Sequence, residues 1–81
     1  MKIYVGNLSP DTTEFQLRKA FERYGKVDLI SMNGQPHKDS IYSFCFVNMP
    51  FVNQASQAIK KLNGKKLSGY ILNIKESSFN I

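Results

Sequence analysis

Aromatic side chains alternate along the most β-prone stretch of the chain, residues 41–49. Side chains of a strand point to opposite faces with a period of two, so Tyr42, Phe44 and Phe46 share one face. The other face carries residues that suit a buried core: Ser43, Cys45, Val47 and Met49. Planar rings on an open surface stack against nucleobases, and neighbouring ammonium groups attract phosphates. The alternation therefore favours a stacking surface for a single-stranded nucleic acid.

A fourth ring, that of Tyr4, is expected on the same surface. Ile3 and Val5 alternate with Tyr4 and are the better core residues. Four exposed rings would form an apolar patch of a kind that monomers normally avoid. Either the C-terminal segment with Phe79 or a second copy of the chain covers the patch, or a ligand stacks on it. The flanking lysines favour the ligand.

Basic residues beside these rings are the expected phosphate contacts. Lys2 and Lys75 lie in the first and last of four strand-like runs. Lys38 lies in the segment between the second and third of these runs. Asn73 is a candidate for reading a base edge. The chain has 11 Lys and Arg against 6 Asp and Glu, a net charge of +5. This excess suits a polyanionic partner but does not locate its site.

Six elements must position these residues. Hydrophobic periodicity predicts strands over 2–6, 27–33, 40–49 and 70–76 and helices over 13–24 and 52–62. Thr13 and Gln16 have the spacing of a capping box, and residues 65–69 predict a turn. The order β-α-β-β-α-β predicts an α+β fold, a ferredoxin-like sandwich in which two helices back a four-stranded antiparallel sheet. The first and third strands are then the central pair.

Length and composition exclude several classes of protein. The chain has 81 residues, enough for one small domain and too few for a catalytic cleft between domains. No apolar run approaches the ~18 residues that a membrane span needs. Cys45 and His37 are single, which excludes an internal disulfide and a multi-cysteine zinc site. We therefore expect no cofactor, no metal, no membrane and no catalysis.

Two motifs resemble those of the RNA recognition motif (RRM) family. Ile3-Tyr4-Val5-Gly6-Asn7-Leu8 matches the family's hexamer motif at every defined position. Tyr42-Ser43-Phe44-Cys45-Phe46-Val47-Asn48-Met49 is similar to its octamer motif, less closely. The resemblance runs through both helices and covers nearly all of residues 1–81. It implies a single RRM domain that binds single-stranded RNA across its sheet.

The resemblance implies roles for individual rings. Tyr4 would stack on one base and Phe46 on the next, with Phe44 against the sugars between them. Asn7 would shape the turn after the first strand. The octamer usually opens with Lys or Arg, where this chain has Tyr42. That exchange removes a phosphate contact and adds a ring, so we expect stacking to contribute more to affinity and electrostatics less.

Two other binding functions stay open. Phe15 and Phe51 occur near the helix starts, where polar residues are expected, and would suit a protein-interaction domain that uses its helix side. Our expectation is that each packs against a neighbouring loop. Single-stranded DNA is the second alternative, because rings stack on the bases of either nucleic acid.

The resemblance also leads to expectations about the oligomeric state of the protein and its location in the cell. Small stand-alone proteins of this family are a bacterial type, so we expect a complete, monomeric, cytoplasmic protein. A domain excised from a larger eukaryotic protein would be nuclear. A protein partner is compatible with either case.

Overall fold

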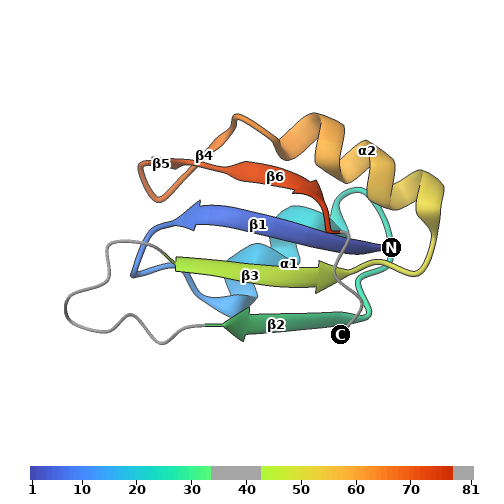
Figure 1. The fold of residues 1–81 in the computed structure, drawn as a ribbon, viewed down its shortest axis with the longest axis horizontal. Coiled ribbons are helices and arrows are strands. Elements are labelled where there is room, and N and C mark those ends of the chain that lie inside the picture. Colours follow the sequence, from blue (N-terminus) through green and yellow to red (C-terminus); the bar gives the residue numbers. More distant parts are fainter. Residues whose placement is uncertain (34–42, 78–81) are drawn as a thin grey trace.

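The helices and strands follow the predicted order, with one additional hairpin. The computed structural model describes residues 1–33 and 43–77. Its elements are β1 (Lys2–Leu8), α1 (Glu14–Glu22), β2 (Leu29–Asn33), β3 (Ser43–Asn48), α2 (Val52–Leu62), β4 (Lys66–Leu67), β5 (Tyr70–Ile71) and β6 (Asn73–Glu76). The main sheet has the order β2-β3-β1-β6, and its neighbouring strands are antiparallel (Figure 1). The predicted α+β fold is confirmed, with β1 and β3 as the central pair.

Period-two alternation separates the two faces of the sheet. Ile3 pairs with Val47 and Val5 with Cys45, and none of these four side chains is exposed. They share one hydrophobic core with inward residues of the two helices: Leu17, Phe21, Ala55 and Ala58. Figure 1 looks onto the opposite face of the sheet, with α1 behind β1 and β3. The helices therefore leave that face of the sheet uncovered.

The start of α1 is set by a capping box. Thr13 Oγ1 accepts a hydrogen bond from the backbone N–H of Gln16 at 3.1 Å, and Gln16 Oε1 accepts one from the N–H of Thr13 at 3.0 Å. Two N–H groups that the helix cannot pair internally are thereby satisfied. Thr13 is thus the residue before the helix rather than its first residue. Neither α1 nor α2 is long and apolar enough to cross a membrane.

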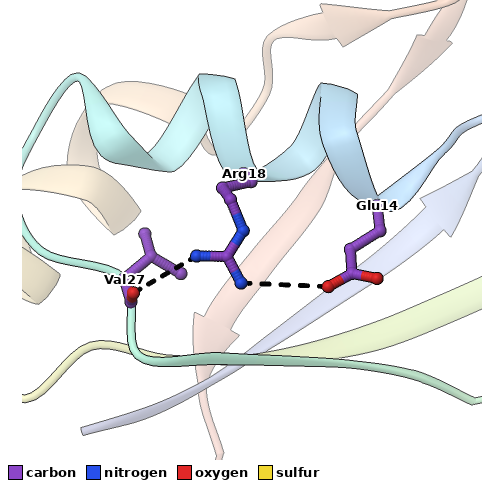
Figure 2. Close-up of polar contacts among 3 residues, drawn as sticks. All are labelled: Glu14, Arg18 and Val27. Atoms are coloured by element: carbon purple, nitrogen blue, oxygen red, sulfur yellow. Dashed lines mark hydrogen bonds and ion pairs between the residues drawn. The ribbon is translucent and has the colours of Figure 1, made fainter.

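Arg18 ties α1 to the segment that leads into β2. Its guanidinium lies between the two elements in Figure 2, where Nη2 is 3.8 Å from Glu14 Oε1 and Nη1 donates to the carbonyl of Val27 at 3.3 Å. The ion pair spans one helical turn, a spacing that contributes a few tenths of a kcal/mol at an exposed site. The carbonyl contact adds a polar link between α1 and the segment before β2 to the core packing of the helix.

Several predicted bounds differ from those observed. The helix predicted over 13–24 spans Glu14–Glu22, and the strand predicted over 27–33 begins at Leu29. The prediction for 27–33 was wrong at its start: the first residue in register with β3 is Leu29, although Asp28 still donates its N–H to the Asn48 carbonyl. The strand predicted over 2–6 runs two residues further, and 40–42 of the strand predicted over 40–49 lie outside the described residues.

The strand predicted over 70–76 is divided, and the turn predicted over 65–69 is part of a hairpin. β4 pairs with β5, and only β6 joins the main sheet. Ser68 and Gly69 both have positive φ, 53° and 84°, as a two-residue hairpin turn requires. Asn7, whose own φ is 59°, donates its Nδ2–H to the Ile71 carbonyl at 2.8 Å. Asn7 therefore fastens this hairpin to β1, a structural role that differs from the expected one of shaping the turn after the first strand.

Removal of the Thr13 hydroxyl should weaken the start of α1. We expect Thr13→Ala to lower the free energy of unfolding by about 1 kcal/mol, the usual contribution of such a cap. Urea denaturation followed by circular dichroism measures the change. Thr13→Ser keeps the hydroxyl and is the matched control. Equal losses in the two variants would contradict a role for the capping hydrogen bond.

Burial makes the thiol of Cys45 a weaker acid than an exposed cysteine thiol. The side chain has no exposed surface, and desolvation raises the pKa of Cys45 from 9.0 to about 12. The folded state therefore holds this proton more tightly than the unfolded state. Its contribution to stability is complete below pH 9.0 and is lost as the pH rises toward about 12.

Alkaline unfolding of wild type against Cys45→Ala isolates this contribution, because the two proteins differ only at this side chain. We expect the wild-type free energy of unfolding to fall relative to the variant by up to about 1.4 kcal/mol per pH unit above the unfolded-state pKa. The folded thiol should also react slowly with a disulfide reagent at about pH 8, and rapidly once the chain is unfolded. A difference in stability that does not change with pH would overturn the expectation.

Candidate nucleic-acid interface

The strand register brings three of the predicted rings together on the face opposite the core. Tyr4 of β1 pairs directly with Phe46 of β3, and Phe44 lies two residues earlier on β3. Ring centroids are 5.9 Å apart for Tyr4–Phe44 and Tyr4–Phe46, and 6.0 Å apart for Phe44–Phe46. These three side chains are called the ring cluster below. The predicted grouping is therefore observed.

The three rings present their faces in different directions. The planes of Tyr4 and Phe44 are 30° apart, whereas Phe46 is inclined by 62° to Tyr4 and by 83° to Phe44. Edge-to-face contacts of this kind are favourable because the positive edge of one ring meets the negative face of another. Phe44 is 37% exposed and is the most open ring of the cluster. The cluster is thus pre-formed by contacts among its own members.

Gly6 makes room for the ring of Tyr4. The two residues are on the same face of β1, and a methyl group on Gly6 would lie 2.6 to 2.9 Å from the far ring atoms of Tyr4. The Tyr4 ring therefore lies down over the backbone of Gly6 and covers it. The inner face of this ring is occupied by the strand, which leaves its outer face for a ligand. The motif contained Gly6, but sequence reasoning did not recognise this contact.

Both predicted strand lysines lie over rings of the cluster. Lys75 of β6 pairs with Tyr4, and its Nζ is 5.4 Å from the Tyr4 ring centroid. Lys2 of β1 has its Nζ 4.7 Å from the centroid of Phe46. Both distances are within the range of cation–π attraction. The sequence predicted these cations beside the rings, and the structure places them over two rings of the ring cluster.

Polar side chains border the cluster on the neighbouring strands. Asn73 of β6 is exposed and pairs with Gly6, two residues along the strands from the pair of Lys75 with Tyr4. Ser31 of β2 is exposed and pairs with Phe46 on the other side. Groups that can hydrogen-bond base edges therefore stand at both margins. Tyr42 and Lys38, two further predicted site residues, lie outside the described residues.

The helix side carries two exposed aromatic residues. Phe15 near the start of α1 is 67% exposed, and Phe51 just before α2 is 55% exposed. The expectation that each is covered by packing against a neighbouring loop is wrong, because more than half of each side chain is exposed. Lys19 Nζ lies 5.4 Å from the ring centroid of Phe15. Within the described segments, no group of three or more His, Cys, Asp or Glu is placed to hold a metal ion.

Sequence comparison finds relatives that are named for binding RNA or its cap. The profile of the family described as RNA recognition motif matches residues 3–73. Nuclear cap-binding protein subunit 2 of Drosophila persimilis is 38% identical over 72 residues, covering 89% of this chain and 47% of that protein. Probable RNA-binding protein 18 of Mus musculus is also 38% identical over 72 residues, which cover 79% of this chain and 35% of that protein. The chain thus spans half or less of the length of these relatives.

Solved structures share the fold over the full length of the chain. The RNA binding protein PG1 is 31% identical, with a TM-score of 0.84 over 100% of this chain and 98% of its own. The first two RRM domains of the yeast poly(U) binding protein are 27% identical, with a TM-score of 0.90 over 100% of this chain and 48% of that one. The profile match, the order of its strands and the ring cluster on its sheet together show that this chain belongs to the RNA recognition motif family.

Proposed function

We propose that this domain binds single-stranded RNA across the open face of its sheet and catalyses no reaction. The observation that carries the proposal is the ring cluster, three rings within 6.0 Å of one another on the face opposite the core, with two ammonium groups over them. Membership of the family and the names of the relatives support it. Neither helix covers this apolar patch, and nucleobases are planar partners that stack on exposed rings.

Each member of the site has a physical role in this proposal. Tyr4 and Phe46 stack on neighbouring bases, and Phe44 lies against the sugars between them. Lys2 and Lys75 attract the phosphates, and Asn73 hydrogen-bonds a base edge at the margin. Tyr42 and Lys38 extend the same surface, a prediction that stands on the sequence. Stacking accepts every base, so the sequence preference depends on the margins of the cluster.

The oligomeric state of the protein and its location in the cell are also part of the proposal. A monomer is the simplest state in which the open face is free for RNA. The name of the nuclear cap-binding relatives favours the nuclear alternative over the cytoplasmic expectation. Those relatives are about twice as long as the matched region, so we do not extend cap binding to this domain.

A second candidate is a protein-interaction domain that uses the helix side. Phe15 and Phe51 favour it, because both side chains are largely exposed to solvent in the structure. The sheet face is the stronger candidate, since its rings come with cations and margins of polar side chains. The two functions use opposite sides of the domain and are separable by mutation.

Truncation of a cluster ring should weaken RNA binding far more than truncation of a helix-side ring. We expect Phe46→Ala to lose about 1–3 kcal/mol of binding free energy, the contribution of one stacked base. Phe15→Ala removes the same side chain from the helix side and is the matched control. Fluorescence anisotropy with labelled random-sequence RNA octamers measures the loss, and DNA octamers of the same design test the alternative ligand. Equal affinity of wild type and Phe46→Ala for RNA would overturn the proposal.

Gly6→Ala should shift the Tyr4 ring with little effect on folding. The clash involves the far end of a flexible side chain, so the ring can swing away at low cost. We expect the variant to lose part of the ~1–3 kcal/mol that a base stacked on Tyr4 contributes. A double-mutant cycle identifies the cause: in a Tyr4→Ala background, Gly6→Ala should have no further effect on RNA affinity. An undiminished effect there would contradict a role through Tyr4.

A further inference from the structure

An ammonium group lies over the ring of Tyr4. The far end of this ring lies close to Gly6, and Lys75 Nζ is 5.4 Å from the ring centroid, so a base that stacks on Tyr4 competes with this ammonium for the ring. On β1, Lys2 and Tyr4 are two residues apart and so share a face of the strand, and Lys2 Nζ reaches to 4.7 Å from the centroid of Phe46. Within the ring cluster, the two rings proposed to stack bases are therefore the two over which a cation lies.

Nothing else among the described residues holds these two cations. The ion pair that the structure shows in residues 1–33 and 43–77 joins Glu14 to Arg18, on the helix side of the domain. Across those same segments no cation lies over Phe44, the most exposed ring of the cluster. Each ammonium can thus leave its ring without breaking an ion pair to a residue of 1–33 or 43–77, but it leaves only if a better partner replaces the ring.

A phosphate is such a partner, and an uncharged ligand is not. When a base stacks on Tyr4 it displaces the ammonium of Lys75, and the phosphodiester next to that base offers a charge-assisted hydrogen bond in exchange. A neutral planar molecule displaces the same ammonium and offers nothing in return. The same exchange applies to Lys2 on Phe46. Binding therefore includes a transfer of each lysine from a ring to the backbone of the ligand.

We propose that Lys2 and Lys75 are specificity-determining residues that close the stacking rings to uncharged planar ligands and open them to strands with phosphodiester linkages. The proposal rests on the proposed RNA-binding function and adds a selection by backbone charge at the same site. Beyond attracting phosphate, the lysines act against neutral ligands. Their removal should consequently strengthen one class of ligand while it weakens the other.

Two octamers of one sequence separate these effects, one with phosphodiester linkages and one with uncharged methylphosphonate linkages. We expect Lys75→Gln and Lys2→Gln each to bind the uncharged octamer about two- to fivefold tighter than wild type, the factor that follows from loss of an exposed cation–ring contact. Both variants should bind the phosphodiester octamer more weakly than wild type at low salt. Lys61→Gln, on α2, removes the same charge from the helix side and should leave the uncharged octamer unaffected.

The outcomes distinguish this proposal from the proposed function. If both lysine variants bind the uncharged octamer no tighter than wild type, while Phe46→Ala still loses RNA affinity, the selection is overturned and RNA binding stands. If wild type binds neither octamer, both are overturned. A measurement without ligand adds a separate test: the ε-methylene protons of Lys75 should show a ring-current shift in NMR spectra that Tyr4→Ala abolishes. Absence of that shift in the wild type would also overturn the selection.

Discussion

The antiparallel pairing of β1 with β3 is the constraint on which the other features of this domain depend. It sets Ile3 against Val47 in the core and Tyr4 against Phe46 on the opposite face. Because the side-chain period of a strand is two, a slip of one residue would bury the rings and expose the core residues. Core formation and assembly of the ring cluster are therefore one event, and the hydrophobic burial that stabilises the fold also orders the site.

The ring cluster is held by weak contacts of its own once the sheet has formed. Edge-to-face packing among the rings, the open backbone of Gly6 beneath Tyr4 and the ammonium groups of Lys2 and Lys75 all act on the exposed side of the strands. Each such contact is worth about 1 kcal/mol or less at an exposed site. This is enough to orient the side chains and little enough for a ligand to displace them.

The positive charge of the chain is spread over more than one surface. Among the described residues, Lys2 and Lys75 lie over the ring cluster, whereas other cations stand on the helices, among them Lys60 and Lys61 in the last turn of α2. Cations at that end suit the helix dipole. Net charge thus draws a polyanion toward the domain without choosing a face, and the choice of face depends on the rings.

Much of the fold and the grouping of three candidate rings followed from the sequence by itself, because alternation with period two and capping residues are local patterns that burial must satisfy. Strand order, both helices, the capping box at Thr13 and the grouping of Tyr4 with Phe44 and Phe46 belong to this class. Other features were decided only by the tertiary structure: the β4–β5 hairpin, the exposure of Phe15 and Phe51, the ring of Tyr4 over Gly6, and the cations over the rings. These depend on how flexible side chains and short exposed segments settle against residues distant in the chain. At an exposed site, several such arrangements differ by about 1 kcal/mol or less, and no local pattern of residues selects among them.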